Sequence, residues 1–472
     1  MPETIRPDIC GIGSGAGALK AAMQAAAFGV PVVLVEQGGL GAAVLRSGRL
    51  PAAALMAAAR RAHLAGQASD FGVEAVPVTT DFGRVRQHVR EIIAARAPNA
   101  ARERLAALGI RVIEGAARFK DARTLTVDGE IEIMARRYVI ATASSPALPP
   151  IAGLAALPHL TTETVLDLET CPAHLIVLGA GAEAAEFAQA FRRLGAEVTV
   201  LDGQAPLAGE DAECAAVVLD QLAREGIAVR SGTLGRIEQV GAKIRVLLQG
   251  AGGEETIEGS HVLVASGRWA SVVGLGLDVA GIKYDEHGIA VDGRLRTTNR
   301  RVHAIGEVAG AGAHLAEHQA NLVIRNALFR LPVRFAPEAV PRVILTDPEL
   351  AQVGLTEAEA KARGHRIGVL RWPLRENDWA QAERSPAGHI KLVTTQRGRI
   401  LGVTIVGLGA GELIAPWTLA IGRSTPLNAV AGMIVPYPTL SDIGKWAAAT
   451  YFMSGPASAW ARRVIGLLRR LG

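Results

Sequence analysis

The stretch that decides the fold is Asp8-Ile-Cys-Gly-Ile-Gly13-Ser-Gly15-Ala-Gly17-Ala18, near the start of a 472-residue chain. Its apolar beginning predicts a buried strand and its glycines a tight turn, and the alanine-rich residues 19–28 predict a helix. Residues 30–35 then form a second apolar strand. This is the order of a Rossmann βαβ unit, in which the glycines bring the backbone close to a pyrophosphate at the helix N-terminus.

Further residues of this unit fit a dinucleotide. Glu36 follows the second strand and is placed to accept hydrogen bonds from a ribose diol. Ala18 stands at the third motif position, where a small residue still permits close packing of helix on strand. The first unit therefore predicts these cofactor-binding residues: Gly13, Ser14, Gly15, Ala16, Gly17, Ala18 and Glu36.

The same unit returns at residues 174–202, so the chain contains an internal repeat and two dinucleotide folds. A strand at 175–178 precedes Gly179-Ala-Gly181-Ala-Glu-Ala184, a helix follows to about Leu194, and the strand 197–201 ends at Asp202. An acidic residue there favours NAD, because it would repel the 2′-phosphate of NADP. The predicted binding residues are Gly179, Gly181, Ala184 and Asp202.

Composition excludes several classes of function. The chain has 50 Lys and Arg against 45 Asp and Glu, an excess too small to indicate a nucleic-acid partner. Its three cysteines, Cys10, Cys171 and Cys214, have no metal-site spacing and indicate a reducing compartment, so we expect no metal. We see no signal pattern and no apolar run long enough for a membrane span, and expect a cytoplasmic protein.

Breaks in the pattern divide the chain. Residues 146–158 are rich in proline, and another break lies at 332–341. Alternating strands such as 389–394 and 400–406 follow, which predicts a C-terminal α+β domain with an antiparallel sheet. The fold class is α/β, with two Rossmann-like domains and this third domain. Residues 460–471 are basic and amphipathic, as in a packed or solvated terminal helix or one that touches a membrane surface.

Several later segments carry a family resemblance. Ala141-Thr-Ala143 and Val264-Ala-Ser-Gly267-Arg268 match two chain crossings, and Ile305-Gly-Glu307-Val308 matches a flavin-ribityl segment. Glu317-His-Gln-Ala320 and Tyr437-Pro-Thr-Leu-Ser-Asp442 match a following helix and a C-terminal signature. In these segments, and along nearly its whole length, the sequence resembles the flavoprotein disulfide reductases, the group of dihydrolipoamide dehydrogenase and mercuric reductase.

The resemblance implies FAD on the first domain, NAD(P)H on the second and a homodimer built by the third. It implies a discontinuous FAD domain at 1–150 and 274–335, an NAD domain at 151–273 and an interface domain at 336–472. It also implies that the C-terminal signature of one subunit reaches the flavin site of the other. The further cofactor-binding candidates are Ala117, Thr142, Ala143, Gly267, Gly306 and Glu307.

The sequence departs from the family at its chemical centre. Val44 and Arg49 occupy the positions of the family's two redox cysteines, and Ala53 replaces a lysine. Tyr437 and Asp442 replace the acid–base His and Glu. Thiol–disulfide exchange needs a thiolate, so we expect no disulfide reduction, and mercuric ion would lack its soft ligands. The catalytic candidates become Arg49, beside the flavin, with Tyr437 and Asp442.

Three functions remain open. The first is an NADH:acceptor oxidoreductase that passes electrons from FAD to a small-molecule or protein acceptor. The second is a soluble pyridine nucleotide transhydrogenase, which also carries a Tyr-Pro-Thr signature but must accept NADP. The third is a non-catalytic FAD-binding scaffold or sensor, as the replacement of Cys, Lys and His positions together suggests.

Overall fold

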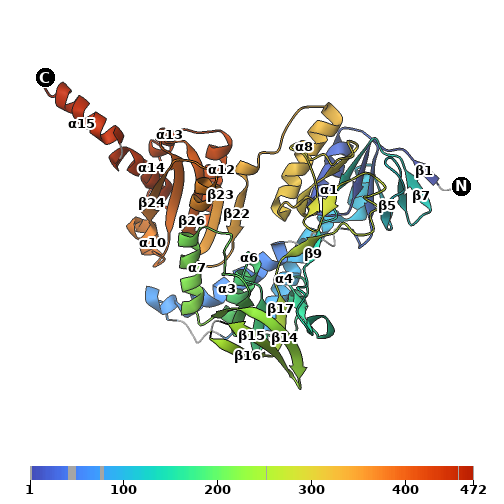
Figure 1. Ribbon diagram of the computed structural model, residues 1–472, viewed down its shortest axis with the longest axis horizontal. Coiled ribbons are helices and arrows are strands. Elements are labelled where there is room, and N and C mark those ends of the chain that lie inside the picture. The colour runs from blue at the N-terminus through green and yellow to red at the C-terminus, as the bar shows by residue number, and fades with distance from the viewer. Residues whose placement is uncertain (1–2, 41–48, 75–78, 251, 455, 471–472) are drawn as a thin grey trace. The chain divides into compact units, whose positions relative to one another are not determined.

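The computed structural model describes residues 3–40, 49–74, 79–250, 252–454 and 456–470 (Figure 1). The chain forms two compact units. Unit 1 consists of Met1–Leu178, Gly235–Val246 and Glu258–Phe335, and unit 2 consists of Gly179–Leu234, Leu247–Ile257 and Ala336–Gly472. The α/β fold class is confirmed, whereas the domain boundaries expected from the sequence stay a prediction. No described helix is long and apolar enough to cross a membrane.

Unit 1 is built on a five-stranded parallel sheet in the order β21-β8-β2-β3-β4. Its strands are β2 (Ile9–Ile12), β3 (Val32–Glu36), β4 (Ile110–Glu114), β8 (Arg137–Ile140) and β21 (Val302–Ala304). Side chains alternate between its faces. Ile9 and Leu34 pack with helices α1 (Ala16–Ala27) and α8 (Ala316–Phe329), whereas Cys10 and Val35 point to the other face.

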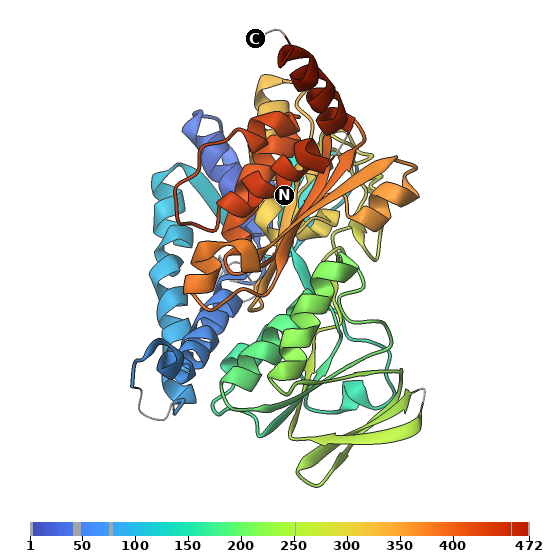
Figure 2. The same cartoon turned by 90° about the vertical axis from the view of Figure 1, so that its left-hand side faces the viewer.

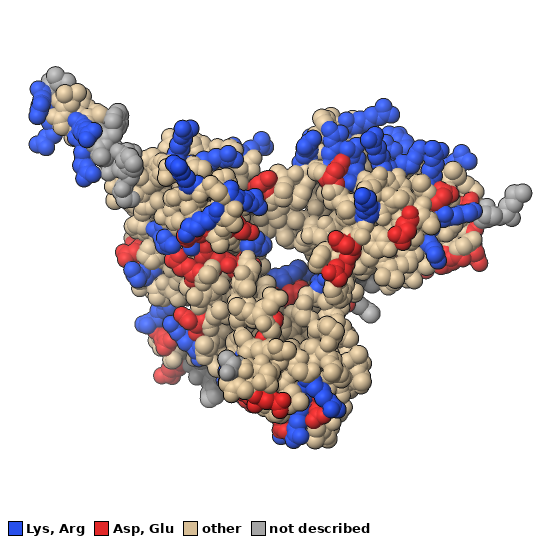
Figure 3. Space-filling view, viewed as in Figure 1, with Lys and Arg blue, Asp and Glu red and all other residues tan. Residues whose placement is uncertain are grey.

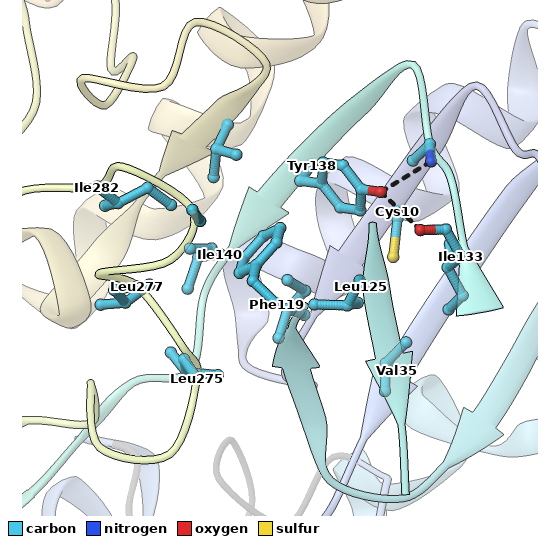
Figure 4. Close-up of a cluster of buried hydrophobic side chains, with 14 of the residues drawn as sticks. Cys10, Val35, Phe119, Leu125, Ile133, Tyr138, Ile140, Leu275, Leu277 and Ile282 are labelled. Carbon is cyan, nitrogen blue, oxygen red and sulfur yellow. Dashed lines mark hydrogen bonds between the residues drawn. The ribbon is translucent and has the colours of Figure 1, made fainter. Parts of the chain in front are cut away.

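A small sheet covers that other face, formed by β1 (Glu3–Ile5), β7 (Ile131–Ile133), β6 (Leu125–Val127) and β5 (Ala117–Phe119). Phe119 and Tyr138 meet edge to face, 5.2 Å between ring centroids, in the core of Figure 4. The Tyr138 hydroxyl accepts a hydrogen bond from the Ala135 N–H and donates toward the Ile133 carbonyl oxygen, 2.7 Å away. The buried polar atom is therefore satisfied, as a stable core requires.

Unit 1 contains further elements outside this core. Helices α3 (Arg49–Gly66) and α4 (Phe82–Arg96) lie side by side (Figure 2). Strands β10, β17 and β11 pair in parallel, and β9 pairs with β18 antiparallel. The bounds are α5 (Arg102–Ala107), β9 (Ser144–Pro146), β10 (Leu160–Thr161), β11 (His174–Leu178), β17 (His261–Val264), β18 (Arg268–Ala270), β19 (Tyr284–Asp285), β20 (Gly288–Ile289) and the 3-10 helices η1 (Ala68–Phe71), η2 (Ala97–Ala100), η3 (Leu154–Ala156), η4 (Thr164–Asp167), η5 (Gly306–Ala309) and η6 (Ala313–Leu315).

Unit 2 contains the second glycine turn and the C-terminal domain. The turn leads into α6 (Ala182–Arg193), β12 (Glu197–Asp202), α7 (Ala212–Arg224) and β13 (Ala228–Ser231). Residues of β14 (Thr233–Val240), β15 (Lys243–Gly250) and β16 (Gly253–Gly259) are divided between the two units.

The C-terminal sheet is antiparallel, in the order β22-β23-β26-β25-β24, so that prediction is confirmed. Buried apolar side chains of its strands form one core with the helices around them. The bounds are β22 (Pro341–Ile344), β23 (Glu349–Gly354), β24 (Ile367–Pro373), β25 (His389–Thr395), β26 (Ile400–Gly407), η7 (Pro337–Ala339), α9 (Glu357–Ala362), η8 (Leu374–Glu376), α10 (Asp378–Ala382), α11 (Ala410–Leu413), α12 (Ala415–Gly422), α13 (Leu427–Ala431), α14 (Asp442–Ser454) and α15 (Pro456–Leu468).

A buried lysine joins α7 to this sheet. The Lys391 ammonium, on β25, lies 2.9 Å from a carboxylate oxygen of Asp211, 3.2 Å from one of Glu213 and 2.9 Å from one of Glu357. Burial opposes its charged form, but the hydrogen bonds that the ammonium donates to these carboxylates outweigh burial and raise its pKa. The carboxylates replace the water that Lys391 lost, so the pairing stabilises the fold only while it is complete.

Candidate cofactor-binding site

The first glycine turn requires glycine where the sequence predicts it. Gly13 has φ +95°, and a Cβ there would lie 2.6 Å from the Ala141 carbonyl oxygen. Gly15 is the N-cap residue of α1, which leaves the helix N-terminus open toward a ligand. A Cβ on Gly17 would lie 2.9 Å from Ile305 Cδ1. The helix begins at Ala16, three residues earlier than the alanine-rich pattern predicts, because the turn residues already adopt helical conformation.

A cavity of about 340 Å³ opens on the β3 side of this turn. Glu36 ends β3 at its wall, and one carboxylate oxygen accepts a hydrogen bond from the Gly38 N–H at 2.7 Å. The second oxygen leaves an acceptor for a ribose hydroxyl. Six predicted binding residues come together around this cavity: Gly13, Ser14, Gly15, Glu36, Ala117 and Thr142.

A second cavity, of about 220 Å³, lies on the other side of the turn and shares Gly15 and Ala141 with the first. Its wall is mostly apolar, with a few charged groups, among them Arg49 at the start of α3 and Glu307 in η5. The predicted residues on it are Gly15, Ala16, Gly17, Arg49, Ala143, Gly306 and Glu307. Ala18 is instead fully buried, on the face of α1 that packs on the sheet.

Glu307 is held by a network that sequence reasoning missed. The Ser144 hydroxyl donates to a Glu307 carboxylate oxygen at 2.9 Å. The Arg268 guanidinium donates to the Ser144 hydroxyl at 2.7 Å and to Glu163 at 2.6 Å. Arg268 ends the second family-like crossing at residues 264–268. Its partners Ser144 and Glu163 are more than 100 residues away in the sequence, so the motif alone could not predict these contacts. Arg268 Nε also lies 3.9 Å from the other Glu307 carboxylate oxygen, so the network holds both oxygens of Glu307 at the cavity wall.

The backbone around Glu307 is also held in place. Gly306 has φ +72°, and its N–H donates to the Gln319 side-chain oxygen at 2.7 Å. Gln319 belongs to the family-like segment on α8 and is buried. Ala143 has φ +61°, a left-handed conformation that is uncommon for a residue with a Cβ. The Thr142 hydroxyl donates to the Ser271 carbonyl oxygen at 2.8 Å, which joins the first crossing to the segment just after the second.

The second glycine turn lies at the start of unit 2. Gly179 has φ +118°, and Gly181 is the N-cap residue of α6, on whose buried face Ala184 lies. Asp202 ends β12, and its two carboxylate oxygens accept from the Ala180 N–H at 2.6 Å and the Gln204 N–H at 2.9 Å. Asp202, whose negative charge would repel a 2′-phosphate, thus also holds the backbone of the turn in place. Gly267, with φ +112°, lies in unit 1.

The arginines of α6 are already engaged. Arg193 is 4% exposed and pairs with Glu225 at 2.7 Å and with Asp347 at 2.9 Å. Arg192 donates to the Glu225 carbonyl oxygen at 2.7 Å. Both arginines lie in the last turn of α6, at the opposite end of the helix from the glycine turn, where these contacts join α6 to the segments that follow it.

The two C-terminal candidates each contact the start of α10. The Tyr437 hydroxyl donates to the Asp378 carboxylate at 2.6 Å, which raises the pKa of the phenol. Asp442 accepts from the side-chain amide of Asn377 at 2.5 Å, and Asn377 is buried as the N-cap residue of α10. The structure thus gives the two residues separate partners.

The cysteines lie away from both cavities. Cys10 is fully buried in β2 and Cys214 in α7, and burial raises the pKa of both thiols. Burial also raises the pKa of Cys171. Among the described residues that line the two cavities, none is a cysteine. Val44 lies outside the described residues. Within the described ranges, no group of His, Cys, Asp and Glu has a metal-binding arrangement.

Comparison with family models decides the classification. Residues 7–328 match the model of pyridine nucleotide-disulphide oxidoreductases, and residues 340–448 match the dimerisation domain of the same group. The chain belongs to this family. Membership supports FAD as the cofactor with NAD(P)H as the nucleotide, and the second match supports a homodimer.

Individual relatives are similar over almost the whole chain. A mercuric reductase of Streptomyces lividans is 34% identical and covers 94% of this chain and 96% of its own. A dihydrolipoyl dehydrogenase of Thermus scotoductus is 35% identical, covering 92% and 95%. The crystal structure of LpdA from Mycobacterium tuberculosis is 26% identical with a TM-score of 0.85, covering 94% and 99%. A Cu(II) complex of the HOCl-induced flavoprotein disulfide reductase RclA from Escherichia coli is 25% identical with a TM-score of 0.83, covering 94% and 99%.

Proposed function

We propose that the protein is a FAD-dependent NADH:acceptor oxidoreductase that works without a redox disulfide. The observation that carries this proposal is the cavity wall at α3. Arg49 lies there, at a position where the resemblance places a redox cysteine, and the three thiols of the chain lie elsewhere. The family's route for electrons through a disulfide is therefore closed, whereas the cofactor cradle is intact.

The residues present fit FAD. The glycine turn allows close approach of a pyrophosphate because Gly13 has no Cβ. One flanking cavity includes Glu36 and the other Glu307, which suits the two halves of a dinucleotide. In this proposal Glu36 holds the adenosine ribose and Glu307 the ribityl chain. Bound FAD supplies hydride acceptance and electron release, while the chain supplies binding and orientation. The domain division stays as proposed: 1–150 with 274–335, 151–273 and 336–472.

Arg49 is proposed to provide fixed positive charge at the flavin side of the site. A guanidinium on this mostly apolar wall attracts an anionic acceptor and stabilises negative charge beside it. Leu50 and Ala143 lie on the same wall. In this proposal the residue at this position is no longer a thiolate nucleophile. It acts instead through the fixed positive charge of its guanidinium.

NADH is proposed as the electron donor. The Asp202 carboxylate disfavours a 2′-phosphate, and the arginines of α6, Arg192 and Arg193, lie at the far end of that helix in contacts with Glu225 and Asp347. Tyr437 is proposed to bind or orient rather than to move protons, because Asp378 raises the pKa of its hydroxyl above an ordinary value that is already far from neutrality. Reduction of disulfides or of mercuric ion is not proposed, since both need a thiolate beside the flavin.

Anaerobic titration of the FAD-loaded protein with NADH tests the proposal. We expect the flavin absorbance to bleach with NADH, more slowly with NADPH, and without a thiolate charge-transfer band. Equal bleaching by both nucleotides would favour the transhydrogenase. A flavin that stays oxidised with either nucleotide would overturn the proposal in favour of a scaffold or sensor.

A further inference from the structure

The C-terminal helix α15 carries a concentration of positive charge. Residues 443–472 contain five Lys and Arg and no Asp or Glu. The whole chain has 50 basic and 45 acidic residues, so residues 1–442 hold 45 of each. The entire formal charge of +5 is thus that of this last stretch. The family's dimerisation model ends at residue 448, before α15 begins.

The described part of α15 separates this charge from apolar side chains. At about 100° per residue, the arginines fall within about 120° of the helix circumference. They are Arg462, Arg463, Arg469 and Arg470. The backbone N–H of Arg469 donates to the Ile465 carbonyl oxygen, so the helical hydrogen-bond pattern continues to Arg469, just past the end of α15. The remaining circumference is apolar, with Val464, Ile465, Leu467 and Leu468.

The apolar face is exposed to solvent. Ile465 is 54% exposed, Leu467 61% and Leu468 56%. Figure 1 shows α15 extending from unit 2 beyond α14, and Figure 3 shows Lys and Arg side chains along it. Met453, at the end of α14, adds another large apolar side chain with 71% exposure. Solvent exposure of adjacent leucines and isoleucine costs free energy that a partner surface would recover.

We propose that α15 binds the surface of an anionic lipid membrane and lies in its plane. Its 13 residues span about 20 Å, whereas the hydrocarbon core is about 30 Å thick, so the helix is too short to cross. An interfacial helix instead buries leucine and isoleucine among acyl chains and holds arginine at the headgroups. The arginine face of α15 therefore matches the headgroup layer, and its apolar face matches the acyl chains.

Other occupants fit this surface less well. A second copy of α15 would bring the arginines of two like helices together. A nucleic acid would pair with the arginines but leave Ile465 and Leu468 facing water. The anionic bilayer satisfies both faces at once.

The test is sedimentation of the full-length FAD-loaded protein with vesicles. We expect binding to vesicles of equal parts phosphatidylglycerol and phosphatidylcholine and at least tenfold weaker binding to phosphatidylcholine alone. Binding should fall as salt rises to about 1 M, where the Debye length is about 3 Å. No preference for the anionic vesicles would overturn the proposal.

Two variants examine the two faces. The variant R462Q/R463Q/R469Q/R470Q should bind more than about a hundredfold more weakly, because each arginine at an anionic surface contributes about a fivefold factor. Leu467→Ser with Leu468→Ser, which keeps all charges, should lose tenfold or more. The matched control R363Q/R366Q/R397Q/R399Q removes four exposed arginines elsewhere in unit 2 and should bind as the wild type does.

Measurements of FAD content and of size-exclusion volume accompany each variant. Wild-type binding by the four-arginine variant would overturn the proposal, as would a change of oligomeric state in that variant, which would assign α15 to subunit contact. Binding of an RNA oligonucleotide through the same arginines, with no vesicle sedimentation, would also overturn it.

Discussion

In the proposed function, Arg49 stands where the resemblance places a redox cysteine, and it carries a permanent positive charge that a thiol lacks. It lies on a wall that also carries Glu307, so its guanidinium brings positive charge to a small, mostly apolar space. A lysine there would keep the charge without the planar fork, and a methionine would keep only the length.

We expect Arg49→Met to lower turnover with ferricyanide, an anionic acceptor, about tenfold, because attraction to a fixed cation is lost. Arg49→Lys should retain most of that turnover. Steady-state rates with ferricyanide and with a neutral quinone distinguish attraction of an anionic acceptor from stabilisation of negative charge at the cofactor. A fall with both acceptors places the effect at the cofactor, and unchanged rates with both would remove Arg49 from the mechanism.

Gly13 tests the cofactor cradle itself. Gly13→Ala adds a Cβ 2.6 Å from the Ala141 carbonyl oxygen at φ +95°, so we expect a purified protein with FAD affinity at least tenfold lower. Gly29→Ala is the matched control, because Gly29 also has a positive φ, +72°, but its added Cβ meets nothing within 4 Å. Flavin absorbance per protein measures both. Equal FAD content in the two variants would contradict a cofactor role for the turn.

At the scale of elements, the strands and glycine turns follow closely from the sequence. The strand predicted at 175–178 appears as His174–Leu178, and the strand before Asp202 as Glu197–Asp202. Local rules suffice here, because a buried parallel strand reads as a continuous apolar run and a left-handed turn residue reads as glycine.

Contacts between distant segments were not predictable in this way. Nothing local to Ser144 indicates that it joins Arg268 to Glu307, since those contacts depend on how β9 and β18 pair. Tyr437 and Asp442 were expected as a catalytic pair, and their partners on α10 emerge only in the folded chain. Side-chain networks depend on tertiary geometry that periodicity does not encode.

The attachment of α7 and α9 to β25 depends on Lys391. Lys391→Met should destabilise unit 2 by about 3–5 kcal/mol at pH 7, because the buried Asp211 carboxylate loses its charged partner. Lys361→Met is the control: its exposed pair with Glu357 is worth less than about 1 kcal/mol. Urea unfolding followed by tryptophan fluorescence measures both, since five of the six tryptophans lie in unit 2.

The same variant has a defined pH dependence. Arg371 and Lys391 hold the pKa of Glu213 at about 2, and Lys361 and Lys391 hold that of Glu357 at about 2, against an ordinary 4.5. A lowered pKa contributes stability above about pH 4.5 that is lost as pH falls toward 2. Wild type should therefore lose more stability than Lys391→Met in this window. A gap between the two that stays constant from pH 7 to about 3 would contradict the pairing.

At the scale of the whole molecule, activity should be independent of thiols. A variant with Cys10→Ala, Cys171→Ser and Cys214→Ala should keep NADH turnover per bound FAD within about twofold. The cost of removing the buried thiols should appear only in stability, at about 1 kcal/mol each. Stopped-flow reduction of the flavin by NADH measures the rate. A loss of turnover with FAD retained would show that a thiol takes part.

The uneven distribution of charge along the chain has a practical consequence for preparation. Four of the five excess positive charges lie within residues 462–470. A preparation clipped by a protease before Arg462 would lose them and elute much earlier from a cation-exchange column, while its yellow colour and the remaining 1–461 sequence were retained. Two yellow peaks on that column would therefore report cleavage of the tail rather than two folded states.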